Sequence, residues 1–168
     1  MAEVDVFVIL GHCQFEKNNY QNRFQMGDQW NTMSVNKGIE NIVDKRYVEY
    51  ERDWAKIKKR LVGYNLERFD GDISRSLFDT NVAIIKRIRD MLGIDTEVAF
   101  DSPTTAMGTE RLIEIIRRFG ASSYLAGRGS VKYMDTARLD SAGIRLCIQS
   151  VDAPSQKPIL QILKERNV

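Results

Sequence analysis

The sequence predicts a mixed α/β fold, and three observations lead to that class. Residues 4–10 form an apolar, β-branched run, which is typical of a strand that is covered on both faces. Segments with helical spacing then alternate with short apolar runs along the chain, which is the order of βαβ units. The alternating stretch over residues 20–35 is interrupted by the turn dipeptide Gly27-Asp28, which indicates a hairpin. The full expectation is a mostly parallel, three-layer Rossmann-like sheet with an antiparallel hairpin as an appendage.

The individual elements follow from the period of the apolar residues. Strands are expected where short apolar or alternating runs lie between turn residues. They are residues 4–10, which we expect to be a central strand, the two arms of the hairpin within 20–35, and 39–43, 96–100, 122–127 and 144–149. Helices are expected where apolar side chains recur every three or four positions, as Trp54, Ile57 and Leu61 do. They cover residues 48–61, 76–92 and 108–119.

The ends of these helices carry residues that suit helix termini. Asp72 or Ser74 is expected to cap the second helix, and Thr109 is expected to cap the third. Asp135 precedes the segment TARLDSAG and is expected to be the N-cap of a further short helix. Gly93 follows the second helix, where a glycine commonly ends helical structure.

Length, charge and cysteine use narrow the possible functions. A chain of 168 residues is long enough for one domain with a buried core. Its net charge of +2 is far short of the dense Lys and Arg surface that binds duplex DNA, so DNA is a possible partner that charge does not indicate. Two distant cysteines predict neither a zinc site nor disulfides, and no other metal site is expected. This usage is typical of a cytoplasmic protein, and the first apolar run is too short for a signal or a membrane span.

A crowded polar segment follows the first strand. Residues 11–23 read GHCQFEKNNYQNR, and open α/β proteins place their sites at the carboxyl ends of such strands. His12 is the one histidine of the chain and the candidate catalytic base. The amide and guanidinium groups of this segment suit binding of a sugar hydroxyl, a carboxylate or a phosphate. The candidate substrate-binding residues among them are Gln14, Asn19, Asn22 and Arg23. The alternative is that they only complete the hydrogen bonds of a turn.

A second candidate site is the loop after residues 122–127. Gly127 and Gly129 let a backbone approach a ligand closely, Arg128 between them is an anion partner, and Ser130 completes the loop. We expect this loop to lie opposite Asn22 and Arg23 across one pocket, because parallel strands of one sheet deliver their carboxyl ends to one edge. The alternative is that this loop is an ordinary connection between a strand and a helix. No GxGxxG or P-loop motif occurs, so the cofactor is unknown.

Motifs along nearly the whole chain are similar to the WbqC-like family. They are DVFVIL followed by CQFEKNNYQNR, W.T.SV, LGI.T, LIEIIRRFGASSYLAGRGSVKYMD and PSQKPILQIL. QFEKNNYQNR and YLAGRGSVKYMD are the most specific of them. The resemblance implies a single WbqC-like domain over residues 1–168. It also implies a chain that is short at its amino end, because members usually open with a further strand and a His-Gln-Pro segment, and usually carry two aspartates where this chain has Gly11 and His12.

The family context implies a function as well. WbqC-like proteins occur in O-antigen gene clusters and in phage genomes. The resemblance therefore implies a transferase-type enzyme, or a remnant of one, that acts on an activated sugar or nucleotide-linked substrate in surface-polysaccharide tailoring. One alternative is a phage enzyme that attaches an amino acid or similar group to a modified DNA base. Another is a binding or assembly module without catalysis. A homodimer of such a module would cover an exposed sheet edge.

Overall fold

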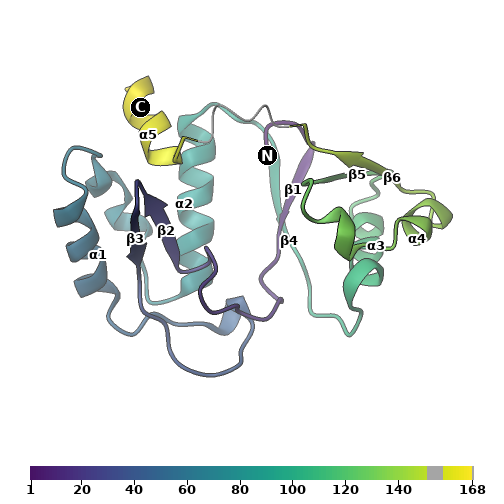
Figure 1. Ribbon diagram of the computed structural model, residues 1–168, viewed down its shortest axis with the longest axis horizontal. Helices are drawn as coiled ribbons and strands as arrows, with labels where there is room; N and C mark the ends of the chain where they lie inside the picture. Colours follow the sequence, from purple (N-terminus) through teal and green to yellow (C-terminus); the bar gives the residue numbers. More distant parts are fainter. Residues whose placement is uncertain (151–156, 168) are drawn as a thin grey trace. The chain divides into compact units, whose positions relative to one another are not determined.

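Two compact units make up the chain (Figure 1). The computed structural model describes residues 1–150 and 157–167. Unit 1 consists of Met1–Asp101 and Gln156–Val168, and unit 2 consists of Ser102–Ser155. The chain therefore leaves unit 1 after Asp101 and returns to it with the last helix. The single domain expected from the sequence stays a prediction.

The strands of unit 1 form two separate pairs. β1 (Val6–Ile9) runs parallel to β4 (Glu97–Phe100), with Ile9 opposite Phe100. β4 is the one neighbour of β1 in that sheet, so the central position expected for β1 is not observed. β2 (Arg23–Met26) and β3 (Gln29–Thr32) form the predicted antiparallel hairpin. Gly27 at its turn has a φ of 56°, a conformation that glycine adopts without strain.

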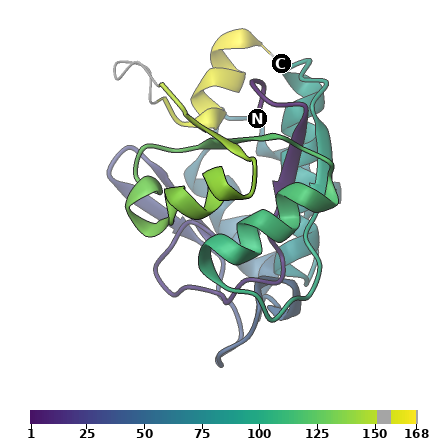
Figure 2. The same cartoon turned by 90° about the vertical axis from the view of Figure 1, so that its right-hand side faces the viewer.

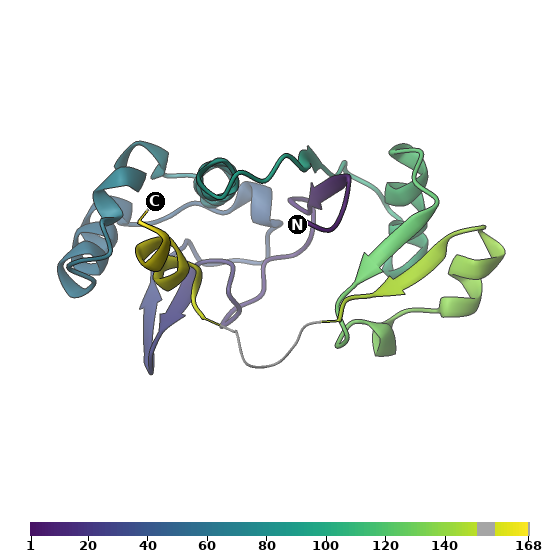
Figure 3. The same cartoon turned by 90° about the horizontal axis from the view of Figure 1, so that it is seen from above.

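Helices surround the hairpin of unit 1. They are α1 (Tyr50–Arg60), α2 (Leu77–Met91) and α5 (Ile159–Arg166), with the short 3-10 helices η1 (Ile42–Asp44) and η2 (Leu66–Asp72). In Figure 1 the hairpin lies between α1 and α2, and Figure 3 looks along α2 and shows α5 beside the hairpin. The core is built from all of these elements. Its most deeply buried apolar side chains are Ile57, Leu66, Phe69, Leu77 and Leu163.

Unit 2 is a compact βαβ arrangement with one additional helix. β5 (Ser123–Ala126) and β6 (Arg145–Ile148) are parallel, and α3 (Gly108–Arg118) and α4 (Thr136–Ser141) lie on one face of the pair (Figure 2). The 3-10 helix η3 (Val131–Tyr133) follows the loop after β5. Side chains of both helices close the core of this unit. They are Ile113, Ile116 and Leu139, together with Ile144.

The mixed α/β class is confirmed. Parallel strands occur in both units and the antiparallel hairpin is present, but the parallel strands form two pairs and not one continuous sheet. None of the helices within residues 1–150 and 157–167 is long and apolar enough to cross a membrane.

Three local predictions were wrong. Residues 39–43 form no strand; the pairing with residues 11–15 is limited to an isolated bridge between Gln14 and Asn41, and η1 begins at Ile42. Ser76 caps α2 by accepting from the N–H of Asp79, in place of Asp72 or Ser74. The residue before α3 is Met107, which makes no side-chain cap.

The remaining observations on helices concern α3, α4 and α5. The hydroxyl of Thr109, expected to cap α3, accepts instead from the N–H of Asp135. Asp135 is the N-cap of α4 as predicted, because its carboxylate accepts from the N–H of Arg138. Helix α5 was not predicted from the sequence. It buries Leu160 and Leu163 in unit 1.

Candidate active site

The parallel pair of unit 1 brings two polar residues together at one edge. β1 and β4 end side by side, and the N–H of Asp101 donates to the carbonyl of Ile9 at 3.2 Å. The residues that follow the two strands therefore leave the sheet at neighbouring points. His12 follows β1 and Asp101 follows β4, so a candidate base and a carboxylate meet where site residues were expected.

The Asp101 carboxylate holds the turn that carries His12. It accepts from the backbone N–H of Gly11 at 2.8 Å and from the backbone N–H of His12 at 3.2 Å. The Nδ1 atom of His12 lies 3.0 Å from Oδ1 of the same carboxylate. The Asp101 side chain is 1% exposed and the His12 side chain is 27% exposed. A buried acid thus fixes the backbone and the ring of a partly exposed histidine.

This geometry determines which ring nitrogen is basic. An ionised carboxylate only accepts hydrogen bonds, so it favours the imidazole form that carries hydrogen on Nδ1. The Nε2 atom then carries the lone pair that can accept a proton. A histidine oriented in this way by a buried carboxylate is the arrangement of a general base. The sequence predicted His12 but not Asp101; the available signal was an acidic residue directly after the strand TEVAF.

Close packing fixes the same turn against α2. A Cβ on Gly11 would lie 2.6 Å from Cε2 of Phe78, so no larger residue fits without a shift. Phe78 in turn packs edge-on against Phe100 at the end of β4, with 5.8 Å between the ring centroids. Asn81, three residues further along α2, donates to the carbonyl of Gln21 at 2.8 Å. Because residues three apart lie on one helix face, α2 supports both the His12 turn and the entry to the hairpin.

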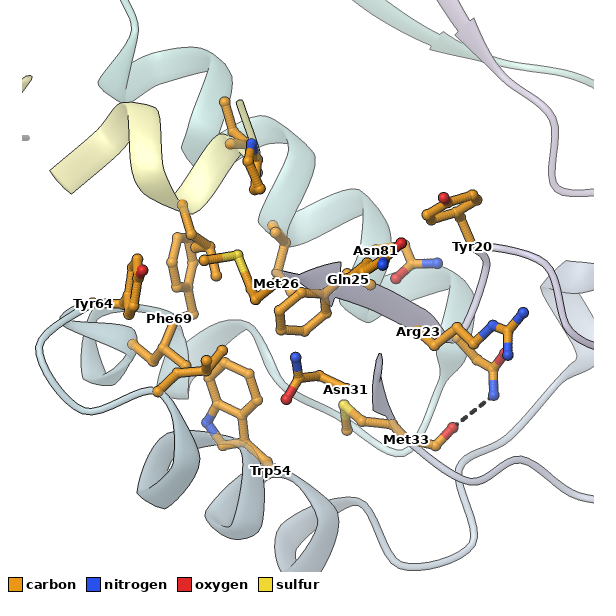
Figure 4. A pocket seen from close by; sticks show the side chains of 18 of the residues that line it. Tyr20, Arg23, Gln25, Met26, Asn31, Met33, Trp54, Tyr64, Phe69 and Asn81 are labelled. Carbon is orange, nitrogen blue, oxygen red and sulfur yellow. Dashed lines mark hydrogen bonds between the residues drawn. The ribbon is translucent and has the colours of Figure 1, made fainter. Parts of the chain in front are cut away.

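A pocket of about 1080 Å³ lies beside the hairpin, and we call it the hairpin pocket. Figure 4 shows Tyr20 and Arg23 at one end of it, and Trp54, Tyr64 and Phe69 at the other. Most of its wall is apolar and comes from the hairpin, α1, η2, α2 and α5. These wall residues include Phe24, Met26, Met33, Tyr47, Leu61, Leu66, Ile73, Ile84, Ile88 and Leu160. Burial raises the pKa of Tyr47 above its usual range, so its hydroxyl stays neutral in this wall.

Arg23 lies at the polar end of the hairpin pocket. Its guanidinium stacks on the ring of Trp30, with Cζ 3.9 Å from the ring centroid, and one terminal nitrogen donates to the carbonyl of Asn18. Its Nε atom is buried and has no hydrogen-bond partner within the described residues. Tyr20 lies 5.1 Å from Trp30 between ring centroids, so the ring that stacks on the cation is itself packed against a second exposed aromatic ring.

The other predicted residues of the polar segment have different environments. Asn22 lines the hairpin pocket with Arg23, but its Nδ2 atom donates to the carbonyl of Met33 at 2.9 Å and so also closes the hairpin. Asn19 bonds to Glu16 and to the N–H of Tyr20, which is a local turn. Gln14 is exposed and forms an isolated bridge with residue 41. Neither Asn19 nor Gln14 lines the hairpin pocket.

The Gly127–Ser130 loop belongs to unit 2. Its N–H and hydroxyl donors at Ser130 both bond to the carbonyl of Gly127, at 3.1 and 2.6 Å, so the loop is a closed turn. Arg128 is exposed, and a Cβ on Gly127 or on Gly129 would meet nothing within 4 Å. A backbone this open lets a ligand approach. The shared pocket expected for this loop with Asn22 and Arg23 stays a prediction.

Comparisons with known proteins agree with the motifs in the sequence. The model of the WbqC-like protein family matches residues 1–158. The chain belongs to this family. It is also 27% identical over 167 residues to Rv1507c of Mycobacterium tuberculosis, an uncharacterized protein, with 87% of this chain and 72% of that protein covered. No solved structure matches the chain. Within the described residues, no group of three or more His, Cys, Asp or Glu side chains is placed to hold a metal ion.

Proposed function

We propose that this WbqC-like protein is a transferase that acts on an activated sugar or nucleotide-linked substrate, in the tailoring of surface polysaccharide. The observation that carries the proposal is the contact between Nδ1 of His12 and the buried carboxylate of Asp101 at 3.0 Å. A buried acid that orients a partly exposed base favours catalysis over a binding module without it. The polysaccharide context comes from the family resemblance.

The reaction is a general-base-assisted displacement. An acceptor hydroxyl or amine gives its proton to Nε2 of His12 while its oxygen or nitrogen forms a bond to the donor carbon. The bond between that carbon and the phosphate leaving group breaks, and the electron pair departs with the phosphate. Asp101 stabilises the imidazolium that forms, because its carboxylate lies against Nδ1.

Binding of the substrate's anionic part is assigned to Arg23. Its guanidinium has a buried Nε without a hydrogen-bond partner among the described residues, and it is held in place by Trp30. A phosphate supplies several acceptor oxygens, which suit such a donor. Asn22 lines the same end of the hairpin pocket, where it can orient the acceptor. Arg128 is retained as a second anion partner on the sequence prediction alone.

The test is product analysis with substitutions of the dyad. The full-length protein is incubated with a panel of nucleotide-linked sugars and polysaccharide acceptors, and the products are identified by mass spectrometry. His12→Asn is expected to reduce turnover about 10²- to 10⁴-fold, the usual effect of a general base. The control is Lys17→Ala, an exposed position that should leave turnover unchanged. The proposal is overturned if the wild-type protein converts no member of the panel, or if His12→Asn is as active as the wild type.

A further inference from the structure

The hairpin pocket has the form of a site for an amphiphile. Its volume of about 1080 Å³ lies just above the range that small-molecule sites usually occupy, roughly 300–1,000 Å³. Its wall is made of core residues such as Met33, Trp54 and Phe69, each less than a tenth exposed. A protein core normally contains few voids larger than a water molecule. An opening of this size bordered by core side chains therefore offers a largely apolar surface to a ligand.

The charge of the pocket is confined to one end. Arg23 is the one charged side chain among the described residues that line it. The other polar side chains near that end are uncharged, namely the phenol of Tyr20 and the amides of Gln21, Asn22 and Asn81. No carboxylate pairs with Arg23 within the described residues, and its buried Nε makes no hydrogen bond. A buried donor of this kind is costly to leave unpaired, and an anionic group would satisfy it.

We infer that the hairpin pocket binds an anionic amphiphile, with an extended hydrocarbon chain among the core side chains and a carboxylate or phosphate head at Arg23. The inference rests on the proposed function only in that a molecule with a phosphate head would be the transferase substrate. Its chain would lie between the hairpin, α1 and α5, and its head would lie at the end of the pocket that α2 supports through Asn81. The substrate class is thereby narrowed to activated molecules that carry an apolar chain.

Equilibrium binding tests this without knowledge of the reaction. The probes are octanoate, decanoate and dodecanoate below their micelle concentrations, with octanol as the uncharged match for octanoate and dodecyl phosphate as the phosphate match for dodecanoate. Both tryptophans of the chain report on the site, since Trp54 lines the pocket and Trp30 stacks on Arg23. Affinity is expected to rise roughly fourfold with each added CH₂ group. Octanol is expected to bind at least tenfold more weakly than octanoate.

Two substitutions test the hydrocarbon chain and the anionic head of the ligand separately. Ile84→Trp places a larger side chain in the wall of the pocket and should weaken dodecanoate at least tenfold, while Lys86→Trp, exposed on the same helix, should not. Arg23→Gln should reduce the difference between octanoate and octanol to less than twofold, while the exposed control Lys17→Gln preserves it. Circular dichroism checks that each variant is folded, and calorimetry measures binding to the variants, because these substitutions alter the tryptophan signal itself. The chain-length series on the wild-type protein needs no variant at all.

The outcomes also distinguish this inference from the proposed function. An affinity that does not change with chain length, or that Ile84→Trp leaves unchanged, overturns the amphiphile site whatever the enzyme does. Equal binding of octanoate and octanol overturns the anionic head. If dodecanoate and dodecyl phosphate differ in affinity, the tighter of the two identifies the head group of the ligand. His12→Asn should leave binding unchanged, so loss of turnover with intact binding concerns catalysis alone.

Discussion

At the scale of single residues, one buried carboxylate organises the candidate active site. Asp101 receives the N–H groups of Gly11 and His12 and lies against Nδ1 of the His12 ring. A carboxylate with several hydrogen-bond donors stays satisfied although it is hidden from water. These three contacts of Asp101, with the two N–H groups and with the ring, fix the direction in which His12 leaves the strand. The position of the His12 ring therefore depends on the turn that Asp101 closes.

Gly11→Ala should destabilise the protein by about 1–3 kcal/mol, the usual cost of overpacking a close contact. The new Cβ would lie 2.6 Å from the Phe78 ring. Urea unfolding followed by circular dichroism measures the change. The matched control is Gly71→Ala, because a Cβ there would meet nothing within 4 Å, and it should change stability by less than about 0.5 kcal/mol. Equal effects of the two substitutions would show that Gly11 is not packed as described.

Lys45 is a second residue whose importance lies in its burial. It is 1% exposed, and its ammonium donates to the carbonyls of Asn36 and Gly38 at 3.0 and 2.9 Å. Lys45→Met keeps the bulk of the side chain but leaves these acceptors unpaired, so unfolding should become easier by about 2–3 kcal/mol. The exposed neighbour Lys37 is the control, and Lys37→Met should be close to neutral. A stable Lys45→Met protein in urea would refute this role.

At the scale of elements, α1 and η2 are joined by one exposed carboxylate. Asp70 accepts from the indole N–H of Trp54 at 2.6 Å and from the ammonium of Lys58 at 2.8 Å. The hydrogen bond from Lys58, followed by the one from Trp54, lowers the pKa of Asp70. This contact holds a wall of the hairpin pocket, because Trp54 is part of that wall.

The stabilisation from Asp70 should depend on pH in a defined direction. Because the pKa is lower in the folded state, the contribution is complete above the unfolded value, about 3.9, and disappears as pH falls through the folded pKa. Asp70→Asn should therefore lower the melting temperature at pH 7 and converge with the wild type in acid. Melting curves of both proteins across pH 2–7 measure this. Glu67→Gln on η2 is the control. A difference in melting temperature between Asp70→Asn and the wild type that persists in acid would contradict the role of the Asp70 charge.

Elements with a clear period were predictable, and those defined by distant contacts were not. Residues 4–10, the hairpin turn at Gly27 and the helix around Trp54 carry their own patterns and formed as expected. Residues 39–43 have a strand-like composition, but they pair with the distant residues 11–15 through one isolated bridge only, and a 3-10 helix follows at once. In the site, His12 was recognisable after its strand. Asp101 becomes its partner only because β1 and β4 pair across about ninety intervening residues, which local sequence does not encode.

At the scale of the whole molecule, charge is distributed in local pairs. Basic residues on the helices have acidic neighbours: Lys58 pairs with Asp70, Arg87 with Asp72 and Arg138 with Glu110. The net charge is +2. This pattern differs from the concentrated basic surface by which proteins bind the DNA backbone. It disfavours the alternative of an enzyme that acts on duplex DNA.

Binding to random-sequence duplex DNA should accordingly be weak. We expect an apparent Kd above about 10⁻⁴ M at physiological salt, beyond the range typical of nonspecific DNA-binding proteins. Fluorescence anisotropy with a labelled duplex at several salt concentrations is the measurement. Binding near 10⁻⁶ M that falls steeply with salt would restore the DNA-modification alternative.

Asp101 should make His12 a base through Nε2, and His12 is the single histidine of the chain, so its ring reports on this directly. Long-range ¹⁵N–¹H correlation spectra of the imidazole identify which nitrogen carries hydrogen in the neutral ring. We expect hydrogen on Nδ1, and loss of that preference in Asp101→Asn, because the carboxylate selects the tautomer. A neutral ring with its hydrogen on Nε2, or a spectrum that Asp101→Asn leaves unchanged, would contradict it.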